Sequence, residues 1–285
     1  MKVKVAQSSG FCFGVKRAMD LVLQVTAREN KGEVFTDGPL IHNPQALELL
    51  RDKGVVSLNE TKGKISGTIV IRSHGISPAR LQELKKTGAK ILDATCPKVK
   101  QVQSIIGRYA QQGFFPVIIG DAGHAEVQGL LGFSGKNSLV IQSEDEIKKF
   151  PSQQKICVVA QTTQNREKFL KLKEMIKGQF PQAEIFDTIC EANRKRQEGL
   201  KDLCHAVDAI VVVGGKESGN TKRLVEIAQA EGVPTFFGES ENDLDLKKMS
   251  SYNEIGVIGG ASTPDWVLQK IVGKLENAGQ ETSIR

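Results

Sequence analysis

The sequence contains no long run of apolar residues, and its first residues, Met1-Lys2-Val3-Lys4-Val5, lack the apolar stretch of a signal peptide. No segment approaches the ~18 consecutive apolar residues of a membrane-spanning helix, so we expect a cytoplasmic protein without a membrane span. Aromatic residues make up only 5% of the 285 residues, which argues against a surface that stacks bases. The basic residues form no block, so the net charge of +6 fits an anionic substrate or an acidic partner better than a nucleic acid.

Cysteines are few, and none are paired along the sequence. There are five, an odd number that argues against a disulfide framework in a cytosolic chain. The C-x-x-C pairs of structural zinc sites are missing, as is the closely spaced triplet that cleaves S-adenosylmethionine. Cys157 and Cys204 lie at apolar positions of a predicted strand and helix, so we expect both to be inert core residues.

The other three cysteines, Cys12, Cys96 and Cys190, recur at nearly equal intervals. Each lies where a strand-like apolar run gives way to a basic amphipathic helix, so each third of the chain would supply one thiolate. Three thiolates match three irons of a 4Fe–4S cluster and leave the fourth iron open. A catalytic zinc with two cysteines and one histidine is the alternative metal.

Strand-like runs alternate with helical patterns along the whole sequence, which favours βαβ units and parallel sheets. The order of elements repeats three times, although the identity among the thirds is weak. We predict an α/β fold, a trefoil of three small domains related by pseudo-threefold symmetry around the cluster. The predicted domains are 14–96, 97–190 and 191–285, with the strand in 1–13 joining the third; a polar turn is predicted between strands 234–237 and 254–258.

Polar residues follow six of the predicted strands. Ligands of parallel α/β domains bind at the carboxyl ends of the strands, and Ser, Thr, Asn and His can donate hydrogen bonds to phosphate oxygens. The competing interpretation is that the Ser, Thr and Asn residues are helix N-caps. Three of the four histidines fall in equivalent loops, which favours an anion site; His205 is expected to be structural or exposed. The residues are His42, His74, His124 with Glu126, Thr162 with Thr163, Ser218 with Asn220, and Ser262.

An open iron beside a phosphate pocket implies Lewis-acid or redox chemistry on an oxygen of a phosphorylated substrate. Glu126, two residues after His124, is the natural proton donor or relay. The segment 214–220 is rich in glycine but lacks the Gly-Lys-Ser/Thr ending of a P-loop, so a nucleotide site is not favoured.

The chain resembles the 4-hydroxy-3-methylbut-2-enyl diphosphate reductases (the LytB/IspH family), the last enzymes of the methylerythritol phosphate route to isoprenoids. The motifs span nearly the whole chain in the family's order. They are Gly10-Phe11-Cys12-Phe13-Gly14-Val15, Ile41-His42-Asn43-Pro44, Arg72-Ser73-His74-Gly75, Asp93-Ala94-Thr95-Cys96-Pro97, Gly123-His124-Ala125-Glu126, Ala160-Gln161-Thr162-Thr163, Ser218-Gly219-Asn220 and Gly260-Ala261-Ser262-Thr263-Pro264.

The resemblance implies an oxygen-sensitive 4Fe–4S cluster bound by Cys12, Cys96 and Cys190. It implies a reductive dehydroxylation in which the allylic alcohol binds the open iron, is protonated and leaves as water. Electrons delivered one at a time would give an allyl anion that is protonated to isopentenyl or dimethylallyl diphosphate. Ferredoxin or flavodoxin, both acidic, would supply the electrons. The implied substrate-binding residues are His42, His74, His124, Thr162, Ser218, Gly219, Asn220 and Ser262; the implied catalytic residues are Glu126, Thr162 and His124.

Two features depart from the family pattern. Gly219 stands where many members have a second serine, although its backbone N–H can still serve a phosphate, and the residues around Cys190 match loosely. We expect a monomer, because three self-contained domains need no partner.

A different class is a three-domain Fe–S lyase of the quinolinate synthase type, which would have carboxylate-binding residues and no electron donor. Glu126 and the His/Ser/Asn loops favour the reductase. An Fe–S sensor would not need such polar loops.

Overall fold

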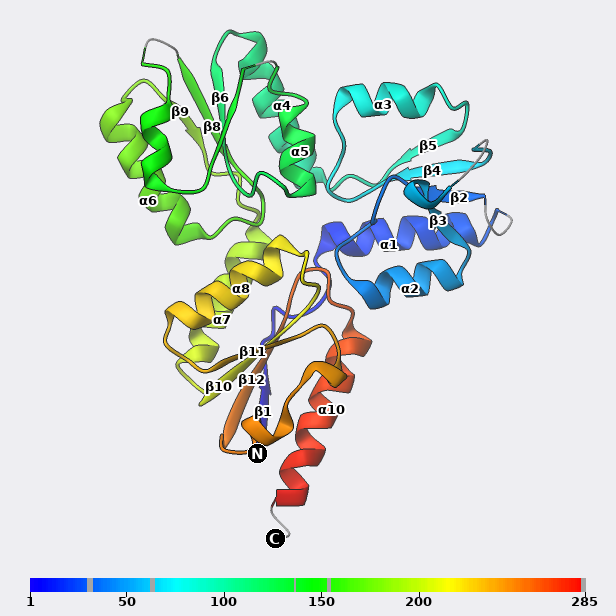
Figure 1. Cartoon of the computed structure of the whole chain (residues 1–285), viewed down its shortest axis with the longest axis vertical. Helices are drawn as coiled ribbons and strands as arrows, with labels where there is room; N and C mark the ends of the chain where they lie inside the picture. Colours follow the sequence, from blue (N-terminus) through cyan, green and yellow to red (C-terminus); the bar gives the residue numbers. More distant parts are fainter. Residues whose placement is uncertain (30–32, 62–64, 136, 153–154, 283–285) are drawn as a thin grey trace. The chain divides into compact units, whose positions relative to one another are not determined.

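The computed structural model describes residues 1–29, 33–61, 65–135, 137–152 and 155–282. Its strands form three four-stranded sheets, each parallel throughout (Figure 1). The predicted α/β class with three repeats of parallel strands is therefore confirmed. Within the described part of the chain, no helix combines the length and apolar character that a membrane span requires.

The first sheet has the strand order β3-β2-β4-β5. Phe35, Ile69 and Ile71 of its strands pack with Leu84 of α3 in a buried apolar cluster. The strands are β2 (Val34–Thr36), β3 (Val55–Ser57), β4 (Thr68–Ile71) and β5 (Lys90–Asp93), and the helices in this part of the chain are α1 (Phe13–Thr26), α2 (Pro44–Asp52), α3 (Pro78–Lys85) and the 3-10 helix η1 (Leu58–Glu60).

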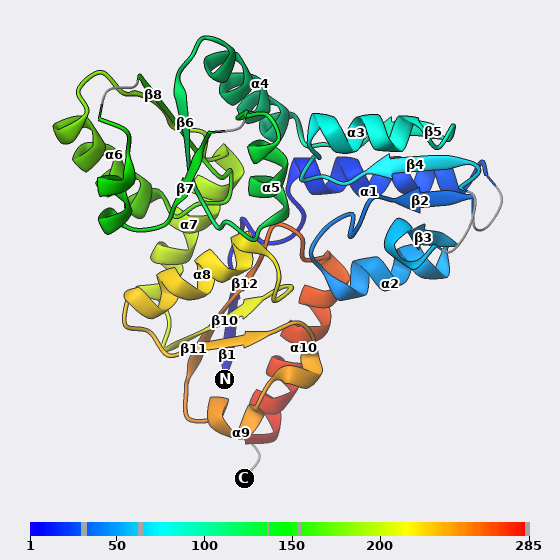
Figure 2. The same cartoon turned by 45° about the horizontal axis from the view of Figure 1, so that its top comes forward.

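The second sheet has the order β7-β6-β8-β9, and helices cover both of its faces (Figure 2). Its elements are β6 (Phe115–Ile119), β7 (Leu139–Ile141), β8 (Ile156–Ala160), β9 (Glu184–Phe186), α4 (Pro97–Gln111), α5 (Ala125–Leu131), α6 (Arg166–Gln179) and the 3-10 helix η2 (Glu144–Lys149).

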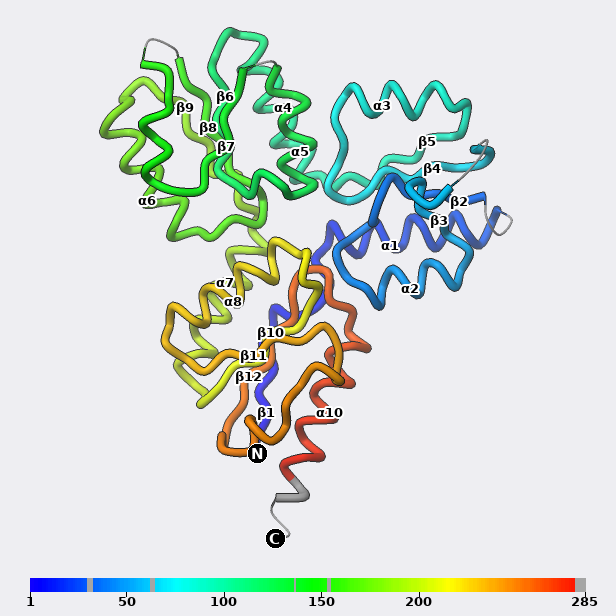
Figure 3. The backbone as a smooth tube through the Cα atoms, viewed as in Figure 1, coloured from blue at the N-terminus to red at the C-terminus, as the bar shows by residue number. Residues whose placement is uncertain are grey.

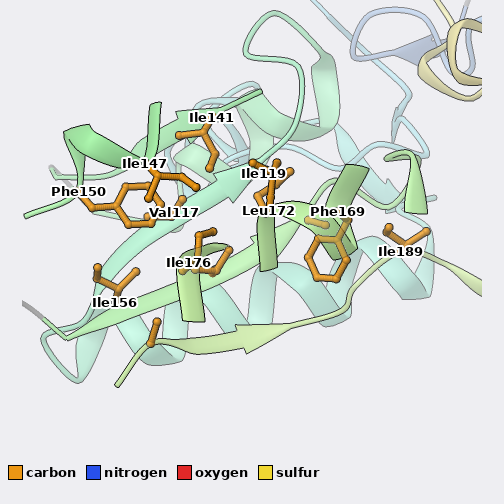
Figure 4. Packing of buried hydrophobic residues seen from close by; sticks show 13 residues of the cluster. Val117, Ile119, Ile141, Ile147, Phe150, Ile156, Phe169, Leu172, Ile176 and Ile189 are labelled. Atoms are coloured by element: carbon orange, nitrogen blue, oxygen red, sulfur yellow. The ribbon is translucent and has the colours of Figure 1, made fainter. Parts of the chain in front are cut away.

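Side chains of this second sheet alternate between two buried clusters. Val117 and Ile119 pack toward Phe169 and Leu172 of α6 (Figure 4), whereas Ile118 packs toward α4 and α5. A sheet covered on both faces has strands that are apolar at every position, which explains why the β6 and β8 patterns show no polar alternation.

The third sheet has the order β1-β12-β10-β11. Its edge strand β1 comes from the N-terminus and pairs with β12, which comes from near the C-terminus (Figure 3). The elements are β1 (Lys2–Val5), β10 (Ala209–Val213), β11 (Thr235–Gly238), β12 (Glu254–Gly259), α7 (Glu191–Cys204), α8 (Gly219–Ala230), α9 (Leu246–Met249), α10 (Asp265–Thr282) and the 3-10 helix η3 (Glu241–Asp243).

The chain divides into two compact units. Unit 1 consists of Met1–Val15, Ile41–Leu49 and Glu191–Arg285 and contains the third sheet, whereas unit 2 consists of Lys16–Leu40 and Leu50–Cys190 and contains the other two sheets. The boundaries at 14, 96 and 190 and the trefoil arrangement stay predictions, and the predicted end at residue 285 lies outside the described residues.

The prediction of a polar turn between β11 and β12 is wrong in part, because this segment contains the short helices η3 and α9. α9 has only four residues, too few for a helical pattern of apolar residues to be visible. Its signals are local: Ser240 and Asp243 form a capping box on η3, and the Asp245 side chain accepts a hydrogen bond from Lys248 N.

Candidate functional site

The same arrangement of loops recurs in all three sheets. In each, a cysteine follows an edge strand: Cys12 after β1, Cys96 after β5 and Cys190 after β9. The predicted polar loops follow the two central strands, and the opposite edge strands β3, β7 and β11 lead to none of the predicted residues. Carboxyl ends of parallel strands share one edge of a sheet, so each sheet presents its cysteine and polar loops from that edge.

Each of the three cysteines directly precedes the first residue of a long helix. Cys12 precedes α1, Cys96 is the N-cap of α4, and Cys190 precedes α7. The backbone N–H groups and the positive dipole end of a helix N-terminus favour a negatively charged ligand beside each cysteine. The five cysteines, all within the described part of the chain, form no disulfide, and these three are half-buried.

The backbone holds the three cysteines in the same way. Each donates its N–H to the carbonyl oxygen that lies two residues beyond the end of the neighbouring strand. The pairs are Cys12–Ala261 at 3.0 Å, Cys96–Ser73 at 2.9 Å and Cys190–Thr162 at 3.0 Å. The same backbone hydrogen bond recurs at all three cysteines and makes their positions structurally equivalent. It joins the backbone of each cysteine to a loop that carries predicted substrate-binding residues.

Polar side chains of unit 1 hold its loops together. The Ser262 hydroxyl donates to the carbonyl oxygen of His42 at 3.0 Å, so Ser262 fixes the His42 segment. Ser218 is the N-cap of α8, and its hydroxyl oxygen accepts a hydrogen bond from Thr221 N at 3.3 Å. The capping interpretation is thus correct for Ser218, yet a hydroxyl that accepts at a cap can still donate its proton to an anion.

Glu126 of α5 and Thr162, in the loop after β8, form a buried pair. The two carboxylate oxygens of Glu126 accept hydrogen bonds from Thr162 N at 2.6 Å and from Thr162 Oγ1 at 2.7 Å. Burial raises the pKa of Glu126 to about 7, although both hydrogen bonds act to lower it. A carboxyl group with a pKa near 7 is suited to give up a proton at neutral pH.

His124 is the N-cap of α5 and lies beside His74. Its Nδ1 accepts a hydrogen bond from Glu126 N at 3.1 Å. A neutral ring with an acceptor at Nδ1 carries its proton on Nε2, which can then donate to an anion. The centroids of the His74 and His124 rings are 5.4 Å apart in an edge-to-face arrangement, so unit 2 brings two of the predicted histidines together.

The family model described as "LytB protein" matches residues 3–276, nearly the whole chain. The chain belongs to the LytB family. A 4-hydroxy-3-methylbut-2-enyl diphosphate reductase of Geotalea uraniireducens is 38% identical over 281 residues, 99% of each protein. The resemblance predicted from the motifs is confirmed.

Solved structures of this family agree. The E-1-hydroxy-2-methyl-but-2-enyl-4-diphosphate reductase of Plasmodium falciparum is 28% identical, with a TM-score of 0.89 over 95% of this chain and 87% of that one. A second structure, described as (E)-4-hydroxy-3-methyl-but-2-enyl diphosphate reductase, the terminal enzyme of the non-mevalonate pathway, is 36% identical. Its TM-score is 0.67 over 97% of this chain and 100% of that one.

The predicted site residues of this LytB family member divide between the two units. Cys157 and Cys204 are buried core residues, as predicted, and burial raises the pKa of their thiols to about 12 and about 11. His205 is exposed, also as predicted, with its ring near Glu231. Unit 1 contains Cys12, His42, Ser218, Gly219, Asn220 and Ser262; unit 2 contains His74, Cys96, His124, Glu126, Thr162 and Cys190.

Two buried amides near the site were missed from sequence. Gln161 bridges two loops, because its Oε1 accepts from Asp121 N at 2.9 Å and its Nε2 donates to Thr163 Oγ1 at 2.8 Å. Asn193 accepts a hydrogen bond from Asn220. The sequence indicated these two residues only through their positions. Gln161 is next to Thr162, and Asn193 lies in the first helical turn after Cys190.

Gly215→Ala is expected to disturb the His42 segment. A Cβ at Gly215 would lie too close to the His42 carbonyl group, which belongs to the backbone and cannot rotate away. We expect the free energy of unfolding to fall by roughly 1–3 kcal/mol, together with a higher KM for the substrate. The control is Gly273→Ala inside α10, where the new Cβ would have no atom within 4 Å apart from its chain neighbours and the backbone of its own helix.

The control should raise the stability by up to about 1 kcal/mol, because alanine favours a helix interior over glycine. Urea unfolding and steady-state kinetics of both variants measure these effects. Equal stability and equal KM in the two variants would contradict the proposed close packing at Gly215.

Proposed function

We propose that this chain reduces (E)-4-hydroxy-3-methylbut-2-enyl diphosphate to isopentenyl and dimethylallyl diphosphate, the last step of the methylerythritol phosphate pathway. Two electrons and two protons enter, the allylic C–O bond breaks, and water leaves. The observation that carries this proposal is the equivalent placement of Cys12, Cys96 and Cys190, each at a helix N-terminus and each hydrogen-bonded to a polar loop. The names of the relatives favour the reductase over the lyase and the sensor.

We propose that the three cysteines bind a 4Fe–4S cluster. The donor set supports this assignment, because three half-buried thiols at helix N-termini suit iron–sulfur ligation and leave one iron without a protein ligand. When bound, such a cluster supplies single electrons and one Lewis-acidic iron. Electrons would come from an acidic carrier, ferredoxin or flavodoxin, and we propose a cytoplasmic monomer.

The residues of this chain bind the substrate and deliver the proton. Seven residues are proposed to donate hydrogen bonds to the diphosphate: His42, His74, His124, Ser218, Gly219, Asn220 and Ser262. Glu126 would protonate the departing hydroxyl group, directly or through the Thr162 hydroxyl that it already binds at 2.7 Å. The raised pKa of Glu126 keeps part of this carboxyl protonated at neutral pH.

The test is anaerobic purification, followed by iron and sulfide analysis and Mössbauer spectroscopy with and without the allylic diphosphate. A 4Fe–4S signal with one distinct iron that changes on adding the diphosphate, together with turnover by a one-electron reductant, is the expected result. A cluster that is indifferent to the diphosphate would favour the lyase or the sensor. Zinc without iron would overturn the cluster assignment.

A further inference from the structure

Asn193 is a buried polar residue in the first turn of α7, three residues after Cys190, and only 1% of its surface is exposed. Its Oδ1 accepts a hydrogen bond of 2.5 Å from Nδ2 of Asn220 on α8. We propose that Asn193 is a positioning residue for diphosphate binding, because it fixes the side-chain amide of Asn220. This inference rests on the proposed function, in which Asn220 binds the diphosphate.

The orientation of the Asn220 amide follows from its partners. The backbone N–H of Ala261 can only donate, so the Asn220 atom that faces it at 2.7 Å must be Oδ1. Nδ2 of Asn220 therefore faces Asn193, which must present its own oxygen. Turning either amide over would set two donors or two acceptors against each other, so Asn193 selects one orientation of Asn220.

Asn220 also connects α8 with the loop after β12. Ala261 donates its N–H to Asn220 Oδ1 and accepts the N–H of Cys12 at 3.0 Å, while the next residue, Ser262, donates its hydroxyl to His42 O. A displaced Asn220 would leave Ala261 N without its acceptor. Asn193 thus supports three of the segments in unit 1 that carry predicted substrate-binding residues.

The chemistry explains why this orientation matters for an anion. An amide NH2 group has two hydrogens, and the bond to Asn193 uses one of them, which leaves the second for a phosphate oxygen. Asn220 is only 2% exposed, so a misplaced amide could not be compensated by bulk water. The expected consequence of losing Asn193 is weaker substrate binding, with the chemistry at the reacting carbon unchanged.

Two variants of equal shape test the inference. Asn193→Val removes the acceptor, whereas Asn193→Thr replaces the amide oxygen with a hydroxyl oxygen that can accept from Asn220. Asn193→Val should lower kcat/KM for the diphosphate by roughly 10–100-fold, mainly through KM, since loss of a buried hydrogen bond leaves its partner unsatisfied. Asn193→Thr should recover most of this loss. If Asn193 had a purely structural role, kcat/KM would fall by the same factor in both variants.

A double-mutant cycle with Asn220→Ala tests the connection directly. If Asn193 acts through Asn220, adding Asn193→Val to Asn220→Ala should change KM by less than about 2-fold. If the valine variant is not recovered as soluble protein, Asn193→Ala takes its place in the cycle. Ile227→Val, a buried change on the same helix α8, serves as the control that lowers stability without raising KM.

The outcomes separate this inference from the proposed function. Wild-type protein that does not turn over the diphosphate overturns the proposed function. If the wild-type protein is active, three results would each overturn the role of Asn193 and leave the proposed function intact. They are a wild-type KM for Asn193→Val, equal impairment of the valine and threonine variants, and additive effects of the substitutions at Asn193 and Asn220.

Discussion

Cys96→Ser is expected to abolish the cluster and all turnover, with iron falling from about four atoms per chain to a trace. A serine hydroxyl is not ionised at neutral pH and is a hard oxygen donor, so it does not replace a thiolate on iron. Cys12→Ser and Cys190→Ser should fail to the same degree, because the same backbone hydrogen bond holds all three thiols. Iron and sulfide analysis after anaerobic purification measures the effect.

Cys204→Ala is the matched control for these variants. Cys204 is the last residue of α7, the helix that Cys190 precedes, and it is buried among apolar side chains. The substitution should keep the full iron content and cost roughly 1 kcal/mol of stability. Brown, active protein from any of the three serine variants would refute the assignment of the ligands.

Glu126→Gln is expected to lower kcat by roughly 10²–10⁴-fold while leaving the cluster and the KM close to those of the wild type. Glutamine has nearly the same shape as glutamate, and its carbonyl can still accept one hydrogen bond from Thr162, but its amide cannot deliver a proton. Glu174→Gln, on the exposed side of α6, is the control and should have wild-type kinetics. A wild-type rate for Glu126→Gln would remove Glu126 from the mechanism.

The pH dependence follows from the same carboxyl group. Because burial raises the pKa of Glu126 from 4.5 to about 7, the protonated donor is depleted as the pH rises through about 7, and kcat should fall there. The raised pKa also means that the folded protein binds the proton more tightly than the unfolded chain. This stabilisation is complete below pH 4.5 and is lost as the pH rises through about 7.

Glu126→Gln should abolish this part of the pH dependence of stability. Urea midpoints at pH 5 and pH 8 would show the wild type losing more stability than the variant over that interval. Parallel curves for the two proteins would mean that Glu126 does not titrate in this range.

The sequence predicted the position of the three thiols because short-range patterns determine it. An apolar run followed by a helical pattern marks a strand-to-helix boundary, and Cys12, Cys96 and Cys190 each lie at one. The same patterns identified Cys157 and Cys204 as core residues, since both lie on apolar positions of regular elements. Local periodicity was sufficient for these assignments.

Partners distant in sequence were not predictable. Asn193 and Asn220 meet only because α7 and α8 pack against one another, and Gln161 meets Asp121 because β6 and β8 are neighbours. The hydrogen bond that Glu126 N donates to His124 Nδ1 was also missed, because the histidine was interpreted as a substrate-binding residue and not as a cap. Ser218 caps α8 and is also proposed to bind phosphate. A serine at the start of a helix suits either role, so the sequence cannot separate the two.

The three thiols proposed to bind the cluster belong to sheets that each have their own buried core, and this separation has a consequence for how the protein would acquire its iron. No short peptide of this chain contains two of the three proposed ligands Cys12, Cys96 and Cys190, so they offer no local chelating segment in a nascent or unfolded chain. With the proposed cluster, the fold would therefore have to form first, held by its apolar cores, and then receive the cluster. Iron that the native state alone binds, as proposed, would stabilise it by mass action, so we expect cells starved of iron to accumulate folded apoprotein with reduced thermal stability.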